Sequence, residues 1–376
     1  MIMMETKLQR RQFFCLAALT VFGGTLAANE LLERAVPKSA KLYSAMDNAL
    51  GEHFISQLDL STQELQQLKT PMRGHTALAL DQHTALLFGR RSASTSVRVN
   101  FKTGLLESFK SRANRHFNGH ACLSTDRTLL FTSETDYANK RGIIGIRELA
   151  TLKQVAEYES YGLDPHDLQL MPDGKTLVVA NGGIETHPDF ERRKLNLDSM
   201  QPSLVYLELS TGKKLAEYRL PDHLLSIRHL QVSAKGEVAV ALQYEGNLYK
   251  QQPSSLVAWQ QVGGELNLLK IAPQEVAQLR GYLADIVYDP KQQLLVSASP
   301  RGHCVSIWST ATHSFVQALP LAEASSISLG SEVDSFLVST SQGSLYQLQT
   351  TTNQARLTEL KHLPELAWDN HLMLLA

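Results

Sequence analysis

Residues 164–183, DPHDLQLMPDGKTLVVANGG, contain a pattern that recurs along the chain. A short alternating run ends at the turn sequence PDGK, in which proline fixes φ and Asp-Gly tolerates the turn geometry. The run TLVVA, rich in β-branched residues, follows at 176–180. Two apolar runs around such a turn predict a pair of antiparallel strands.

Five other stretches repeat this order of apolar run, turn and apolar run. They are RGHTALALDQHTALLFGRRS (73–92), NGHACLSTDRTLLFTSETD (118–136), IRHLQVSAKGEVAVALQYEG (227–246), LADIVYDPKQQLLVSASPRG (283–302) and SSISLGSEVDSFLVSTSQGS (325–344). Two further strand-like runs complete each unit, as SLVYLEL and KLAEYRL do for the first. A repeat of about 45 residues with four such runs predicts a four-stranded antiparallel meander, the blade of a β-propeller.

The two ends of the chain supply one more blade. Six complete units fit between Arg73 and roughly Leu357, and we expect 366–376 to add two inner strands and 53–69 two outer strands. Such closure leaves no free sheet edge. We therefore predict an all-β fold in which residues 29–376 form one domain, a seven-bladed β-propeller of four-stranded antiparallel blades. Six or eight blades remain alternatives, because blade three carries an insertion at 182–203.

The first 28 residues have the pattern of an export signal. Arg10 and Arg11 precede an apolar run that ends in small residues and is shorter than the about 20 residues of a membrane-spanning helix. The arginine pair with Phe13 close behind resembles a twin-arginine signal. We expect cleavage of residues 1–28, export to the periplasm by the twin-arginine pathway, and no membrane attachment afterwards. An uncleaved anchor helix is the alternative.

Charge and motifs exclude several classes of function. The chain has 36 Lys and Arg against 37 Asp and Glu, so it lacks the basic excess of a nucleic-acid-binding protein. It contains no GxSxG, HExxH, CxxC, CxxCH or P-loop sequence. We therefore predict no catalytic residues, and whether the protein is an enzyme stays open.

Histidines occupy the same position in four units. They are His75, His120, His166 and His229. In a propeller this position lies where the chain reaches the innermost strand, close to the central channel. The loops between second and third strands open on the same face, so we expect a mouth there. The residues that we expect to join the histidines are Arg91, Arg115, Glu134, Asp136, Asn181, His187, Gln243, Glu245 and Arg301.

Three interpretations of the histidines stay open. They could be hydrogen-bonding staples within blades, as the Gly-His pairs at 74–75 and 119–120 suggest by their likeness to WD-type blades. They could bind an organic or anionic ligand. They could also hold a metal ion directly, with iron, copper or zinc as candidates, because imidazole suits these ions. A wide channel would argue against a single ion. The insertion is either a lid over the mouth, carrying His187, or a solvated loop.

Four longer motifs together resemble a known family. They are RHFNGHACLSTD (115–126), GLDPHDLQLMPDGKTLVVANGGIETHP (162–188), KLNLDSMQPSLVYL (194–207) and LSIRHLQVS (225–233). The family consists of bacterial twin-arginine-exported β-propellers of unknown function, similar to YVTN and WD40 repeats and to the quinoprotein amine dehydrogenase beta-chain superfamily. Its members are often encoded beside imelysin-like and di-haem cytochrome-like proteins in clusters linked to iron uptake.

The resemblance implies a periplasmic binding module for a ligand or protein partner, linked to iron or metal acquisition. An imelysin-like or cytochrome-like protein is the implied partner, and we expect the propeller itself to be a monomer. Two alternatives remain. One is a metal-dependent oxidoreductase that uses the four repeated histidines, and the other is a purely structural scaffold for interactions.

Overall fold

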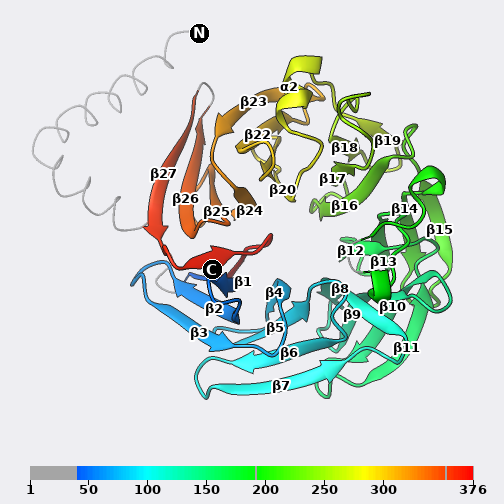
Figure 1. Ribbon diagram of the computed structural model, residues 1–376, viewed down its shortest axis with the longest axis vertical. Helices are drawn as coiled ribbons and strands as arrows, with labels where there is room; N and C mark the ends of the chain where they lie inside the picture. The colour runs from blue at the N-terminus through cyan, green and yellow to red at the C-terminus, as the bar shows by residue number, and fades with distance from the viewer. Residues whose placement is uncertain (1–39, 191–192, 352–353, 376) are drawn as a thin grey trace, which may run out of the picture.

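The computed structural model describes residues 40–190, 193–351 and 354–375, so the predicted signal peptide at 1–28 lies outside the described residues. Seven antiparallel sheets form a ring around a central axis (Figure 1). This arrangement confirms the predicted seven-bladed β-propeller. Within the described residues, helix is confined to α2 (Pro273–Gln278) and the 3-10 turns η1 (Pro188–Phe190) and η2 (Leu197–Ser199). None of these described helices is long and apolar enough to cross a membrane.

Blades 1 to 3 each use four consecutive strands, with the innermost strand first. Blade 1 contains β4 (Gly74–Ala79), β5 (Thr84–Gly89), β6 (Thr95–Asn100) and β7 (Leu105–Lys110). Blade 2 contains β8 (Arg115–Leu123), β9 (Leu129–Asp136), β10 (Arg141–Glu148) and β11 (Gln154–Glu159). Blade 3 contains β12 (Pro165–Leu170), β13 (Thr176–Asn181), β14 (Ser203–Glu208) and β15 (Lys214–Tyr218).

Blades 4 to 6 follow the same order. Blade 4 contains β16 (Leu225–Val232), β17 (Val238–Tyr244), β18 (Val257–Gln260) and β19 (Leu266–Leu268). Blade 5 contains β20 (Asp285–Asp289), β21 (Leu294–Ser299), β22 (Cys304–Ser309) and β23 (Ser314–Pro320). Blade 6 contains β24 (Ala324–Leu329), β25 (Ser335–Thr340), β26 (Ser344–Thr351) and β27 (Gln354–His362).

The closing blade combines both ends of the chain. Its outer strands are β1 (Lys41–Asn48), β2 (His53–Asp59) and β3 (Leu65–Lys69), and its innermost strand is C-terminal. That innermost strand is broken into β28 (Leu366–Trp368) and β29 (Met373–Leu375), which both pair with β1. The expectation of two C-terminal inner strands was therefore wrong. The sequence of β1 gives no alternating signal, because five consecutive residues of this strand are buried.

Neighbouring blades pack through their apolar faces. Tyr43 and Ile55 of the closing blade, for example, share one buried cluster with Leu87 and Val97 of blade 1. This packing fixes the position of each innermost strand around the channel. The residues that face the channel are therefore held by the rigid body of the ring.

Candidate metal centre

The four repeated histidines lie at irregularities in the innermost strands. In β12, Pro165 pairs with Asn181 and Asp167 pairs with Ala180, so His166 is an extra residue without a partner across the ladder. The register of β4, β8 and β16 also shifts beside the histidine of each strand. A bulge of this kind bends the strand and redirects a side chain. The four histidines, which share one position in the repeat, therefore all direct their side chains toward the channel.

Blade 2 can approach His75 only because position 119 is glycine. Gly119 has a φ of +102°, and a Cβ atom there would lie 2.5 Å from Cδ2 of His75. A side chain at this position would therefore overlap the imidazole. Glycine at position 119 therefore allows His75 and His120 to approach each other, with ring centroids 5.0 Å apart.

Five imidazoles converge in the channel. The fifth belongs to His371, which lies in the break between β28 and β29. Its ring centroid lies 4.7 Å from that of His75, 4.6 Å from that of His120 and 4.7 Å from that of His229. The centroids of His166 and His229 are 4.6 Å apart. The possibility that a wide channel keeps the rings too far apart is therefore not realised.

Most of the inner ring nitrogens have no hydrogen-bond partner. Within the described residues, four buried ring nitrogens have no partner: Nε2 of His120, His166 and His371, and Nδ1 of His229. His75, His120 and His166 each place one nitrogen within 4.8 Å of the other two. His120, His229 and His371 do the same. An unsatisfied buried polar atom costs about 1–3 kcal/mol, and these four nitrogens are available to a water molecule or a ligand.

Three of the imidazoles face carboxylates on their outer side. Nδ1 of His75 lies 2.9 Å from Asp369, and Nδ1 of His371 lies 3.3 Å from Asp285. Nδ1 of His120 likewise lies 3.3 Å from an oxygen of Asp167. A carboxylate at Nδ1 holds the proton there and leaves Nε2 free, as in carboxylate–histidine–metal arrangements.

These contacts are not staples within a blade. His75 is in blade 1 and Asp369 in the closing blade, whereas His120 is in blade 2 and Asp167 in blade 3. Asp285 reaches His371 from blade 5. The carboxylates therefore join different blades around the cluster.

Burial determines the protonation of most of the cluster. It lowers the pKa of His75, His120, His166 and His229, because a protonated ring in the channel would lose its hydration. Neutral rings keep a lone pair for a metal ion. Burial would also lower the pKa of His371, but the carboxylates of Asp285, Asp167 and Asp369 together outweigh it and raise this pKa.

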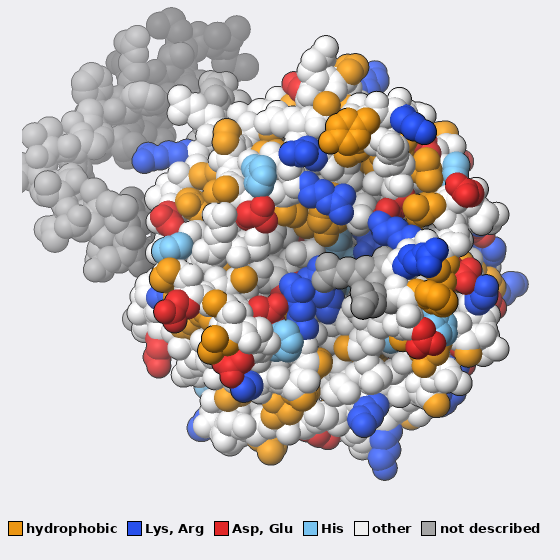
Figure 2. Space-filling view, in the orientation of Figure 1, with side chains coloured by type: hydrophobic (Ala, Val, Ile, Leu, Met, Phe, Trp, Pro, Cys, Tyr) orange, Lys and Arg blue, Asp and Glu red, His pale blue; other side chains and the backbone are white. Residues whose placement is uncertain are grey.

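A basic cavity opens above the cluster. It has a volume of about 380 Å³, and His75, His166 and His229 line it. Six cationic side chains also line it: Arg73, Arg90, Arg91, Lys194, Arg228 and Arg301. Figure 2 shows Lys and Arg side chains gathered around the hollow at the centre of the ring. We call this space the basic mouth.

A second cavity lies against the other histidines. Its volume is about 370 Å³, and its lining includes His120, His371, Asp167 and Asp285. The histidine cluster therefore contributes to two cavities of different chemistry, one lined by cations and one by carboxylates.

Several predicted site residues do lie at the basic mouth. Gln243 and Arg301 line it, as does Arg91. Lys194, from the insertion at 182–203, lines it too and pairs with Glu245 of the loop after β17. Sequence reasoning did not single out Lys194, although the insertion was the segment expected to cover the mouth.

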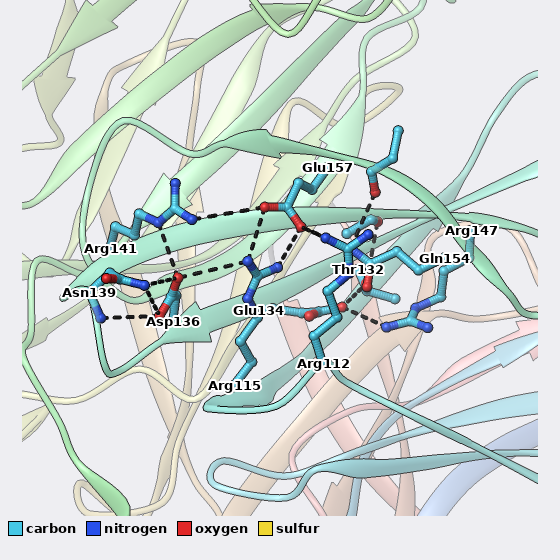
Figure 3. Close-up of polar contacts among 12 residues, drawn as sticks. Arg112, Arg115, Thr132, Glu134, Asp136, Asn139, Arg141, Arg147, Gln154 and Glu157 are labelled. Atoms are coloured by element: carbon cyan, nitrogen blue, oxygen red, sulfur yellow. Dashed lines mark hydrogen bonds and ion pairs between the residues drawn. The ribbon is translucent and has the colours of Figure 1, made fainter.

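Arg115 and Glu134 lie elsewhere, which corrects their predicted position at the mouth. Glu134 is fully buried and pairs with Arg147 at 2.9 Å (Figure 3). Arg115 donates hydrogen bonds to both oxygens of Glu157, 2.6 and 3.0 Å away, and lies 3.8 Å from Asp136 (Figure 3). The reason is that β9 continues to Asp136, so residues expected in a loop belong to a strand of blade 2.

Asn181 and His187 also lie outside the mouth lining. The buried amide of Asn181 donates hydrogen bonds to Ser160 and Ser203, which fastens the end of β13. His187 contacts the ring of Tyr137, with centroids 5.0 Å apart, and Nδ1 of His187 accepts a hydrogen bond from the backbone of Asp189. Both residues therefore have local structural contacts.

The missed members of the cluster are His371, Asp369 and Asp285. His371 and Asp369 stand in the sequence WDNH, at the point where the C-terminal inner strand breaks. The position of His371 within the predicted C-terminal inner strands was the sequence signal that could have indicated a fifth histidine in the cluster. Asp285 occupies the innermost strand of blade 5, whose unit lacks the histidine.

The fold and the site define a seven-bladed β-propeller with five buried histidines in its channel. Residues 68–375 match the family described as "Protein of unknown function (DUF1513)", and the chain belongs to that family. No curated protein matches the chain.

Solved structures share the fold. One is Kuenenia stuttgartiensis hydrazine synthase, which is 13% identical, with a TM-score of 0.60, covering 86% of this chain and 96% of that chain. Another is a chain in the crystal structure of a mitotic checkpoint complex, at 9% identity and a TM-score of 0.53, covering 73% of each chain. At such identities the likeness concerns the propeller architecture alone.

Proposed function

We propose that this protein is a periplasmic binding module that holds one transition-metal ion in the five-histidine cluster. The observation that carries the proposal is the convergence of buried imidazoles whose inner nitrogens lack partners among the described residues. Three outer carboxylates support the same interpretation, because they orient the rings and increase their basicity.

The spacing of the nitrogens fits one ion only after the rings contract toward it. Two nitrogens bound to the same tetrahedral ion lie about 3.4 Å apart, since each bond is about 2.0–2.1 Å long. The two overlapping groups of three histidines have their ligand atoms within 4.8 Å. The longest of these distances would therefore shorten by up to about 1.4 Å when the nitrogens reach bonding distance.

The donor set favours a borderline divalent ion. The cluster offers imidazole nitrogens, which suit iron, copper and zinc, and neither of the two cysteines described is a member of it. The carboxylates of Asp167, Asp285 and Asp369 stand behind the rings and would balance the charge of the ion.

We propose that this metal binding contributes to iron or metal acquisition. The support is the resemblance to propellers encoded beside iron-uptake proteins, together with the buried histidine site. In this role an imelysin-like or cytochrome-like periplasmic protein would exchange metal or electrons with the propeller. The protein would then act as a carrier or sensor.

A metal-dependent oxidoreductase is the second candidate. The observation in its favour is that His75, His166 and His229 line the basic mouth, so a ligand in that cavity could reach an ion in the cluster. Catalytic metal sites keep such an open position, whereas structural sites are closed. Turnover of a substrate would distinguish this candidate from a binding module.

The test is the metal content of protein purified from its native periplasm, measured by elemental analysis and absorption spectroscopy. We expect about one ion per chain, lost in the double variant His120→Ala/His166→Ala. The matched control is His303→Ala/His362→Ala, because both side chains are about half exposed and belong to neither group of clustered histidines. Circular dichroism establishes that each variant is folded. A folded wild type that binds no added iron, copper or zinc would contradict the proposal.

A further inference from the structure

The cationic side chains of the basic mouth outnumber the carboxylates that pair with them. Six cationic side chains line it. The carboxylates that pair with them are Asp47, Asp164, Glu245 and Asp369. Four carboxylates accompany these six cations, so the described lining has two positive charges in excess. A concave site with one sign of charge concentrates ligands of the opposite sign.

Arg301 is one cation without such a partner. Its guanidinium stacks over the ring of Tyr282, 4.8 Å from the centroid, and no carboxylate of the described residues lies within ion-pair distance of it. Stacking on an aromatic face holds the planar group and leaves its N–H donors free. These donors stand in the lining of the mouth.

Arg228 supplies a second, buried donor. One of its terminal nitrogens pairs with Asp164 at 2.9 Å, but its buried Nε has no hydrogen-bond partner among the described residues. The residue is only 9% exposed and lines the same cavity. Arg91 pairs with the other oxygen of Asp164 at 3.2 Å, so one carboxylate serves two guanidinium groups.

We propose that the basic mouth binds a small oxyanion that carries two or more negative charges, a polycarboxylate or a phosphate. Guanidinium forks match carboxylate and phosphate oxygens, and an excess of two positive charges favours a multivalent anion. The volume of about 380 Å³ is that of a small-molecule site. The cavity adjoins the proposed metal centre, because His75, His166 and His229 of that centre belong to its lining.

The experiment is isothermal titration of chelator-treated protein from the periplasm with citrate, inorganic phosphate and acetate at low salt. We expect citrate or phosphate to bind at least about tenfold more tightly than acetate, and the affinity to fall as salt is added. Whichever of citrate and phosphate binds more tightly shows whether the ligand is a polycarboxylate or a phosphate. Arg301→Gln and Arg91→Gln should each weaken this binding about tenfold or more.

The control variant is Arg356→Gln, an exposed arginine on β27, the outermost strand of blade 6. Equal affinity for acetate and citrate, or binding unchanged in both mouth variants, would overturn the proposal. Because the titration uses metal-free protein, its failure is distinct from failure of the metal centre. Citrate binding by a protein that takes up no metal would support the anion site and reject the metal site.

Discussion

His75 and Asp369 lie 294 residues apart in the chain, yet Nδ1 of His75 is 2.9 Å from the carboxylate of Asp369. Their contact joins blade 1 to the C-terminal strand of the closing blade. Asp369 also pairs with Arg73 and Arg90. Burial would raise the pKa of Asp369, but Arg90 and the hydrogen bond from His75 outweigh burial and hold it far below its usual value. Ring closure and formation of the histidine cluster thus depend on the same carboxylate.

The substitution Asp369→Asn should weaken both metal binding and the fold. We expect metal affinity to fall about 10- to 100-fold, because the carboxylate orients His75. The free energy of unfolding should fall by about 2–3 kcal/mol, since two partly exposed arginines lose a charged partner. Zinc titration and urea denaturation measure the two effects.

Asp47→Asn is the matched control for that substitution. Asp47 also pairs with Arg73, and with His53, but it does not contact the cluster, and its side chain is 22% exposed. We expect a loss of less than about 1 kcal/mol and unchanged metal affinity. Wild-type affinity in Asp369→Asn would reject a role for this carboxylate in the metal site.

The repeat made most of the architecture predictable. Alternating apolar runs around turns such as PDGK are local signals, and they recur once per blade. The aligned histidines were equally visible, because they recur at one position in four units, beside a register shift of the innermost strand. The repeat could not predict how close to one another the imidazole rings would lie.

The remaining parts of the site depend on non-local structure. Asp369 and His371 lie in a break between two three-residue strands, and the pairing of both strands with β1 crosses the whole chain. Glu134 was misplaced for another reason, because β9 extends past the predicted turn and buries the carboxylate beside Arg147. Neither strand length nor long-range pairing follows from a local pattern.

Gly119→Ala should disturb the cluster without removing any ligand. The new Cβ would overlap the ring of His75, and the φ of +102° also strains any side chain. We expect the free energy of unfolding to fall by about 2 kcal/mol or more, and metal affinity to fall with it. Thermal unfolding with and without zinc measures both.

Gly104→Ala separates backbone strain from the clash. Gly104 has a φ of +72°, but a Cβ there meets nothing within 4 Å. This variant should lose only about 1 kcal/mol and bind metal as the wild type does. Equal behaviour of the two variants would mean that the contact with His75 is unimportant.

The ion-pair network of blade 2 should make stability depend on pH. Hydrogen bonds from Arg115 lower the pKa of the Glu157 carboxyl below its usual 4.5. A lowered pKa in the folded state contributes stability above the unfolded pKa, and this stability is lost as the pH falls through the folded pKa. We expect Glu157→Gln to cost about 1–2 kcal/mol at neutral pH and to reduce the loss of stability on acidification. Urea denaturation at several pH values tests this.

The corresponding control is Glu265→Gln, at an exposed turn position of blade 4. It should leave both the stability and its pH dependence as in the wild type. A wild-type acid profile in Glu157→Gln would show that the network around Arg115 does not stabilise blade 2.

His371→Gln tests whether the closing blade contributes a ligand to the metal centre. Its inner Nε2 has no partner among the described residues, and its ring touches three other imidazoles of the cluster. Loss of a ligand should cost more than loss of an outer carboxylate, so we expect metal affinity to fall more than about 100-fold. His362→Gln, with a side chain that is 51% exposed, should bind metal normally. If His371→Gln keeps wild-type affinity while His120→Ala/His166→Ala loses it, the ion is held by the repeated histidines alone, and His371 serves to bring Asp285 toward the cluster.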